Sequence, residues 1–306
     1  SLEIDEENNI YVENSWISVD PYMRARMTER KNYKPPFNIG EEMEGYAIGE
    51  VKESKNLNFS KGDLVFSNFG MRDNFICNGK DLKKIKPLEF PVQSYLGPLG
   101  MTGHTAYIGL FYHGKIKSGQ TVLVSSAGGS VGSTVCQIAK NIGCKVIAST
   151  GSDEKVEWLR TELKVDHAFN YKKIDNLVTY FKEICPKGFD LYFDNVGGDF
   201  LEASIFSMKN FGRIIICGRI SQMNVTSAPS GLKNMAHVLV KRLTIKGFLI
   251  FDHEGDREPF ETDMKKWLLE DKIKFKETVY EGIENAPKAF IDLLAGKNIG
   301  KMLVKI

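Results

Sequence analysis

The run TVLVSSAGGSVGS at residues 121–133 holds the pattern that decides the fold. Its first part, Thr121 to Ser126, is an apolar run of strand length, and a helical run follows at Ser133 to Asn141. Between them lies A-x-G-x-x-G, from Ala127 to Gly132, with alanine in place of the usual first glycine. A glycine-rich turn between a strand and a helix is typical of a dinucleotide-binding βαβ unit. Such a turn can also serve only as a tight connection.

The residues of this turn suit a diphosphate group. Gly129 would let the backbone approach the phosphates, and Gly132 would let the helix pack closely against the strand. The free N–H groups and the partial positive charge at the start of the helix favour an anion. A second apolar strand follows at Lys145 to Thr150. This context favours a nucleotide site over a bare connection.

The end of that second strand indicates which cofactor is bound. NAD-specific sites usually place a carboxylate there, which accepts a hydrogen bond from the ribose 2′-hydroxyl. Here the strand ends in Ser149 to Gly151, and Lys155 lies within reach of a 2′-phosphate. The pattern favours NADPH, although Asp153 and Glu154 lie close by. The run from Ser152 to Glu154 also reads as a helix N-cap followed by acidic residues.

The texture of the sequence changes at Gly119. The first hundred residues read as short strands broken by turn residues, which is typical of a β-rich unit. After Gly119, apolar runs alternate with longer amphipathic stretches, as in βαβ units on a parallel sheet. We therefore expect an α/β chain with a β-rich domain over 1–105 and a Rossmann-type, doubly wound domain over 106–256. Residues 257–306 should return to the β-rich domain.

The expected elements follow from these apolar runs. In the β-rich part, the strands are expected at Ile10–Val12, Trp16–Val19, Tyr46–Val51, Asp63–Phe66 and Asn74–Ile76. In the parallel sheet, they are expected at Thr121–Ser126, Lys145–Thr150, His167–Asn170, Asp190–Asp194, Arg213–Cys217 and Leu243–Leu249. After Phe260 we expect helices at Glu261–Glu270 and Glu284–Ala295, and strand-like segments at Thr278–Tyr280 and Met302–Ile306.

Composition excludes several classes of function. The 41 basic and 39 acidic residues give a net charge of +2, which provides no global attraction for nucleic acid or a membrane surface. The five cysteines are scattered and never spaced C-x-x-C, which argues against disulfides and a structural zinc site and fits a reducing cytoplasm. No apolar run approaches the ~20 residues that span a bilayer. The acidic N-terminus lacks a signal peptide's apolar segment, and because it lacks Met, native residues can be missing.

Several strings match one family of reductases. The chain resembles the zinc-independent medium-chain reductases of the prostaglandin reductase (leukotriene B4 12-hydroxydehydrogenase) and plant double-bond reductase type. The likeness covers nearly the whole chain. The matching strings are DPYMR at 20–24, GMTG at 100–103, GSDEK at 151–155, FNY at 169–171, FDNVGG at 193–198 and GRI at 212–214.

The resemblance implies NADPH-dependent reduction of the carbon–carbon double bond of α,β-unsaturated aldehydes and ketones. It also implies a GroES-like catalytic domain formed from both chain ends, and a homodimer. By matching motif, the pyrophosphate would be held by Gly129, Ser130, Val131 and Gly132. The 2′-phosphate would be bound by Lys155 and Tyr171, and the nicotinamide half by Asn195 and Cys217. Asn298 would also contact the cofactor. The family often has a tyrosine where this chain has Phe251, which is expected to line the substrate site.

Hydride addition to an enone builds negative charge on the carbonyl oxygen, so a donor is needed near that oxygen. Tyr22 is the first candidate, with a packed aromatic residue as the alternative interpretation. His253 could also donate, but a histidine between Asp252 and Glu254 is more often an exposed loop residue. Cys217 can equally be a small buried apolar residue. Residues 1–103 contain one cysteine and no histidine, which argues against a catalytic zinc.

Two other functions stay open. A quinone reductase would use the same cofactor geometry, and a non-catalytic NADPH-binding protein would keep the glycine turn without turnover. The shape of the substrate pocket depends on loops such as Thr28–Asn38 and Ser221–Lys233, whose conformation the sequence does not give.

Overall fold

The computed structural model describes residues 3–29, 32–86, 89–224 and 231–306. The chain folds into two compact units. Unit 1 consists of Ser1–Gly97 and Lys276–Ile306, and unit 2 of Pro98–Phe275. The two loops expected to shape the substrate pocket, Thr28–Asn38 and Ser221–Lys233, each include residues outside the described ranges.

The boundaries of the units differ from the expected ones at residues 106 and 257. Helix α2 (Met101–Ile108) packs against α3 (Ser130–Ile142), so it belongs to unit 2. Helix α8 (Arg257–Leu269) packs against α2, which extends unit 2 to Phe275. Packing between helices that are distant in the sequence therefore sets both limits.

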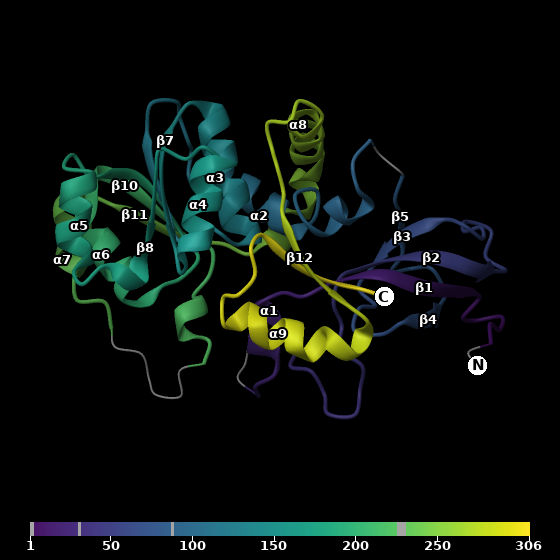
Figure 1. Cartoon of the computed structure of the whole chain (residues 1–306). Coiled ribbons are helices and arrows are strands. Elements are labelled where there is room, and N and C mark those ends of the chain that lie inside the picture. Colours follow the sequence, from purple (N-terminus) through teal and green to yellow (C-terminus); the bar gives the residue numbers. More distant parts are fainter. Residues whose placement is uncertain (1–2, 30–31, 87–88, 225–230) are drawn as a thin grey trace. The chain divides into compact units, whose positions relative to one another are not determined.

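Unit 1 is built around a sheet that uses both ends of the chain (Figure 1). The order of its strands is β12-β13-β1-β2-β3-β5, and β4 also pairs with β1. Strand β13 is antiparallel to β1, with Ile17 opposite Val304, so the expected return of the C-terminal segment is confirmed. The strands are β1 (Ile10–Ser18), β2 (Ala47–Ser54), β3 (Leu64–Ser67), β4 (Asn74–Cys77), β5 (Lys83–Lys84), β12 (Glu277–Glu281) and β13 (Lys301–Lys305).

The first strand of unit 1 corrects one expectation from the sequence. Two strands were expected, at Ile10–Val12 and Trp16–Val19, but β1 is continuous from Ile10 to Ser18. Its pairing with β2 shifts register between Tyr11 and Val12 and again between Asn14 and Trp16. The buried Asn14 side chain donates to the carbonyls of Phe69 (2.9 Å) and Arg72 (2.8 Å). These bonds satisfy the N–H donors of the amide, which allows the strand to continue through a polar residue. The buried Oδ1 of Asn14 has no hydrogen-bond partner among the described residues.

Unit 2 contains a parallel sheet in the order β11-β10-β9-β6-β7-β8. The order reverses between β9 and β6, which is the point where ligands bind in doubly wound sheets. The α/β fold with a Rossmann-type sheet is therefore confirmed. The strands are β6 (Thr121–Val124), β7 (Lys145–Thr150), β8 (His167–Asn170), β9 (Phe189–Asp194), β10 (Met208–Ile216) and β11 (Thr244–Gly247). The other helices of the unit are α4 (Asp153–Thr161), α5 (Leu177–Ile184), α6 (Gly198–Ser207) and α7 (Met235–Lys241).

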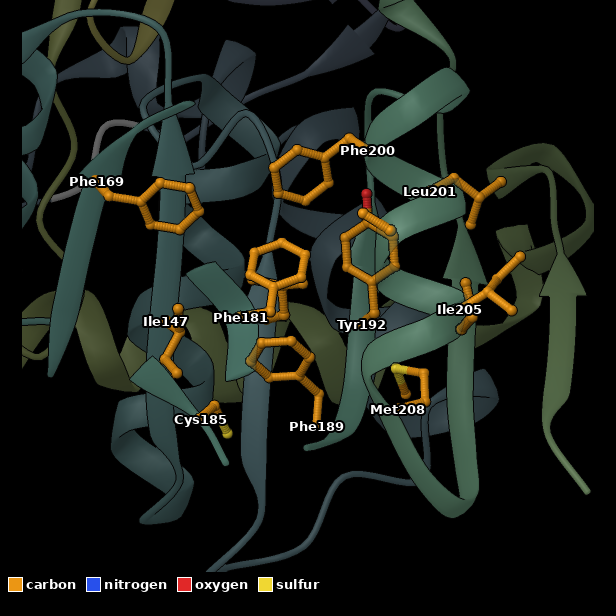
Figure 2. Close-up of a cluster of buried hydrophobic side chains, with 13 residues drawn as sticks. Ile147, Phe169, Phe181, Cys185, Phe189, Tyr192, Phe200, Leu201, Ile205 and Met208 are labelled. Atoms are coloured by element: carbon orange, nitrogen blue, oxygen red, sulfur yellow. The ribbon is translucent and has the colours of Figure 1, made fainter. Parts of the chain in front are cut away.

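An aromatic core holds one face of this sheet against its helices. Figure 2 shows Phe181 of α5 and Phe200 of α6 gathered around Tyr192 of β9. Phe181 and Phe189 meet edge to face, with ring centroids 5.2 Å apart. Rings of this size each bury about 150–250 Å² and dominate the energetics of a core. The end of β9 is thereby held in a fixed position.

Candidate functional site

The glycine-rich turn lies between β6 and α3. Gly129 is the N-cap of α3, and the first turn of the helix comprises Ser130, Val131 and Gly132. A methyl group on Gly132 would lie 2.4 Å from the Ser126 carbonyl oxygen, a distance that no side chain tolerates. The expected close packing of helix on strand is therefore confirmed. The amides of the first helical turn have no carbonyl partner within the helix, which suits them to bind an anion.

Gly128 is a residue of this turn that the motif did not single out. A methyl group on Gly128 would lie 2.8 Å from Lys155 Cδ and 2.9 Å from Thr150 Oγ1. The stem of Lys155 therefore passes directly over the backbone of the turn. Ala127, which replaces the usual first glycine, is buried and donates from its N–H to the Ser149 carbonyl at 2.9 Å. Both contacts fix the turn against the end of β7.

Lys155 lies in the first turn of α4 and is 7% exposed. Burial, followed by the charge of Lys172, lowers its pKa to about 8. The Ser152 hydroxyl accepts from the Lys155 N–H at 3.3 Å, so the expected N-cap is confirmed. Tyr171 begins η3 (Tyr171–Lys173), and its ring lies 3.4 Å from the place of a methyl group on Gly151. The structure thus brings Lys155 and Tyr171 to the same turn, at the end of β7.

Asp153, an acidic residue close to this turn, is paired with Lys173 and Asn170. Lys173 Nζ lies 2.6 Å from Asp153 Oδ2, and the Asn170 side chain donates to Asp153 Oδ1 at 3.0 Å. The hydrogen bond from Lys173 is the first cause that lowers the pKa of Asp153. Lys173 and Asn170 therefore engage one of the two carboxylates that the sequence places near this turn, whereas Glu154 acts on Lys155.

Asn195 and Cys217 follow the neighbouring strands β9 and β10. The Asn195 side chain donates to the Ser125 carbonyl at 2.8 Å, and the Ser125 hydroxyl accepts from the Asn195 N–H at 3.0 Å. Burial, and then the charge of Asp194, raises the pKa of the Cys217 thiol to about 12. A thiol with this pKa stays protonated at neutral pH, so Cys217 is no nucleophile.

Asp194 organises the backbone around Asn195. Its Oδ1 accepts from the Tyr192 hydroxyl at 2.6 Å and from the N–H groups of Val196 and Gly197, both at 2.9 Å. Because Tyr192 belongs to the aromatic core of Figure 2, this network ties the turn after β9 to the interior of unit 2. The DNVGG string therefore has a structural role that the sequence did not reveal.

Tyr22 is the first residue of α1 (Tyr22–Arg26) in unit 1. Burial, and then the nearby Asp20 carboxylate, raises the pKa of its phenol. The hydroxyl therefore keeps its proton at neutral pH and above, as a hydrogen-bond donor requires. At the other end of the same helix, the buried Arg26 forms an ion pair with Glu44 at 2.7 Å and stacks 4.0 Å above the Phe37 ring. These contacts hold α1 in place.

Asn298 lies in unit 1, between α9 (Ala286–Leu294) and β13. It is buried, and its side-chain amide donates to the Gly300 carbonyl at 2.8 Å. Gly300 has a φ of +70°, and a methyl group on it would lie 1.9 Å from the Lys276 carbonyl oxygen. The loop is thus held rigidly, and a contact of Asn298 with a cofactor stays a prediction.

His253 corrects an expectation from the sequence, because it is buried rather than exposed. It lies in the kinked 3₁₀ segment η5 (Ile250–Asp256), which also carries the partly exposed Phe251. Its Nδ1 lies 2.8 Å from Asp256 Oδ2, and its Nε2 lies 3.1 Å from Nε2 of His113. Because both ring nitrogens are engaged within the protein, His253 is a poor candidate for the donor to substrate.

Two negative findings concern the part of the chain that the structure describes. No group of three or more His, Cys, Asp or Glu side chains there could hold a metal ion. Nor does any helix there have the length and apolar character needed to cross a membrane.

Comparison with known proteins identifies both parts of the chain. Residues 3–85 match the N-terminal domain of oxidoreductases, and residues 130–269 match a domain described as zinc-binding dehydrogenase. Prostaglandin reductase 1 of Bos taurus is 43% identical over 98% of this chain and 90% of its own length. The NADP(+)-dependent 2-alkenal reductase of Nicotiana tabacum is 40% identical over 98% of this chain and 88% of its own length.

Solved structures show the same likeness. CurA from Vibrio vulnificus, determined in complex with NADPH, is 38% identical and superposes with a TM-score of 0.92. The match covers 100% of this chain and 92% of CurA. The quinone oxidoreductase of Escherichia coli, at 20% identity and a TM-score of 0.79, shares the fold. Together with the full-length relatives, these matches show that the chain belongs to the medium-chain dehydrogenase/reductase family, in the group of prostaglandin reductase 1 and the NADP-dependent alkenal reductases.

Proposed function

We propose that this protein is an NADPH-dependent reductase that transfers hydride to the carbon–carbon double bond of α,β-unsaturated aldehydes or ketones. The observation that carries the proposal is the turn at the end of β7, where the Lys155 side chain lies over Gly128 and the Tyr171 ring lies beside Gly151. A 2′-phosphate needs cations there, and an NAD-type site would need a free carboxylate. The names of the relatives supply the substrate class.

The residues of unit 2 fit a dinucleotide. Gly129 to Gly132 would hold the pyrophosphate through the amides of α3, and Lys155 with Tyr171 would hold the 2′-phosphate. Asn195 would orient the nicotinamide half, because Ser125 holds its backbone and side chain in one position. When bound, the reduced nicotinamide supplies the hydride.

The remaining task of the chain is to stabilise the charge that develops on the substrate's carbonyl oxygen. Tyr22 would donate a hydrogen bond from its protonated phenol to that oxygen, and Phe251 would offer an apolar wall. Cys217 would contact the nicotinamide half as a protonated, uncharged side chain. Asn298 would add a contact to the cofactor. No zinc is needed in this scheme, because the hydrogen bond takes over the activation of the carbonyl.

We also propose that the protein is a homodimer of the cytoplasm. The support for the dimer is the family resemblance alone, and the support for the compartment is the scattered, unpaired cysteines. Sedimentation of the purified protein tests the first proposal, since a monomeric mass would contradict it.

The activity is tested with purified protein, NADPH and three substrates: nonenal, an aliphatic enone and an ortho-quinone. We expect oxidation of NADPH with the enal and the enone. NADPH that carries deuterium on the transferring carbon should place it on the substrate's β-carbon, which mass spectrometry detects. Turnover of the quinone alone would favour a quinone reductase. Binding of NADPH without turnover of any substrate would favour a non-catalytic NADPH-binding protein.

A further inference from the structure

A second lysine, Lys172, lies beside the turn at the end of β7. It belongs to η3, which follows β8, and its N–H donates to the Asn170 side chain at 3.1 Å. A methyl group on Gly151 would lie 3.4 Å from Lys172 Cε and 3.6 Å from its Nζ. The end of the Lys172 side chain therefore reaches over Gly151, on the route from β7 to α4.

Lys155 and Lys172 approach this turn from two different elements. Lys155 comes from α4 and passes over Gly128, whereas Lys172 comes from η3 and passes over Gly151. Their charges repel each other, since Lys172 is the second cause, after burial, of the lowered pKa of Lys155. Glu154, on the same helix, has the opposite effect. Two cationic side chains that approach one turn suit a phosphate dianion, because each can form a charge-assisted hydrogen bond with it.

The neighbouring Lys173 differs from Lys172 in its partner. Lys173 forms the ion pair with Asp153, at 2.6 Å, on the exposed side of the turn. That pair engages Asp153, whereas the Lys172 side chain reaches over Gly151. The three consecutive positions of η3 thus have separate tasks: an aromatic ring, a cation over Gly151 and a partner for Asp153.

We propose that Lys172 is a second cation for the 2′-phosphate of NADPH and, together with Lys155, selects NADPH over NADH. The inference rests on the proposed function, because it assumes that the adenosine ribose lies at the end of β7. It adds a specificity-determining residue on η3 that the glycine-rich motif and the family strings do not contain.

The test compares Lys172→Met with Lys155→Met and with the control Lys164→Met. Lys164 is exposed and lies beyond the C-terminal end of α4, whose first turn carries Lys155. Its replacement removes the same charge away from the site. Lys173 is unsuitable as the control, because its loss would release Asp153. Calorimetry measures the affinity of each variant for NADPH and for NADH.

We expect Lys172→Met to weaken NADPH roughly tenfold, as the loss of one charge-assisted contact at an exposed position should. The affinity of Lys172→Met for NADH should equal that of the wild type. Lys164→Met should bind both cofactors as tightly as the wild type does. A second readout is proton uptake, measured at pH 8 in buffers of different ionisation enthalpy. The wild type should take up a fraction of a proton with NADPH and none with NADH, because the phosphate raises the pKa of Lys155. Lys172→Met should take up less.

The outcomes separate this inference from the proposed function. If Lys172→Met binds NADPH as tightly as the wild type while Lys155→Met is weakened, Lys172 does not contact the phosphate and the inference is wrong. If neither variant binds NADPH more weakly but the wild type still reduces enones, the ribose lies elsewhere. The inference about Lys172 is then wrong, whereas the proposed activity is supported. Should the wild type fail to bind NADPH, the proposed function itself is wrong.

Discussion

Lys301 Nζ lies 3.0 Å from Asp20 Oδ1, and the two side chains are only 4% and 3% exposed. Lys301 also donates to the Val19 carbonyl at 2.9 Å, and the Ser18 hydroxyl donates to the other oxygen of Asp20. Asp20 precedes Tyr22 by two positions in the DPYMR string. The pair therefore ties the first residue of β13 to the segment that carries the expected proton donor.

Replacement of Lys301 by Met should destabilise the protein strongly. It would leave the Asp20 carboxylate buried without its cation, which costs about 3–5 kcal/mol of the free energy of unfolding. Urea denaturation measures the change. Lys305→Met, at the exposed end of the same strand, is the matched control and should be close to the wild type. An equal loss of stability in both variants would show that the buried ion pair does not contribute more to stability than the exposed Lys305 does.

Replacement of Tyr22 by Phe should lower turnover with enones about 100-fold, the usual effect of removing one donor to a developing oxyanion. The affinity for NADPH should not change, because the hydroxyl would act only on the substrate. Steady-state kinetics and calorimetry measure the two quantities. Tyr11→Phe, which removes a hydroxyl bonded to Glu13 in the same unit, is the control. Unchanged turnover in Tyr22→Phe would exclude Tyr22 as the donor.

Replacement of Gly132 by Ala should weaken the binding of both NADPH and NADH. The added methyl group would clash with the Ser126 carbonyl oxygen and with the α-carbon of Ala127, at 2.4 and 2.7 Å, so α3 must move off β6. We expect a loss of stability of about 1–3 kcal/mol in addition, as for other overpacked sites. Gly255→Ala, where nothing lies within 4 Å of the added atom, serves as the control. A variant that kept full affinity for both cofactors would contradict the assignment of this turn.

His104 should make the protein sensitive to acid. Burial, and then the charge of Arg257, lowers its pKa from 6.5 to about 4, and its two ring nitrogens have no hydrogen-bond partner among the described residues. Between these pH values the unfolded state binds more protons, so stability falls as the pH falls below about 6.5. For this group alone the loss at pH 5 is about 2 kcal/mol.

The variant His104→Leu tests this prediction. It should lose less stability than the wild type between pH 7.5 and pH 5, because the leucine cannot be protonated. Other groups titrate equally in both proteins, so the difference between the two unfolding curves isolates His104. Parallel curves over this pH range would mean that His104 is not the responsible group.

The sequence predicted the parallel sheet well, because its strands are continuous apolar runs between turn residues. The bounds of β7 and β8 agree with the expected Lys145–Thr150 and His167–Asn170. The glycine-rich turn could be predicted equally well, since the role of Gly132 depends on its immediate neighbours in the chain. Local pattern sufficed wherever the partners of a residue lie close to it in the sequence.

Contacts between distant positions could not be predicted. The contact of His253 with His113 joins residues that are 140 positions apart, and it converts an apparent loop residue into a buried one. Likewise, Lys172 and Lys173 look alike in the sequence, and only the fold shows that one lies over Gly151 while the other binds Asp153. The continuous β1 depended on carbonyl groups near Phe69 and Arg72 that accept from Asn14.

The position of β13 between β12 and β1 has a consequence for biosynthesis. As the chain grows on the ribosome, Pro98–Phe275 is complete while unit 1 still lacks an interior strand of its sheet. Domains generally fold as units while the chain is being made. The Trp16–Ser18 part of the nascent β1 must therefore wait for its partner until residues synthesised almost three hundred positions later reach it. During that interval this part of the strand offers an unpaired edge to chaperones or to wrong partners.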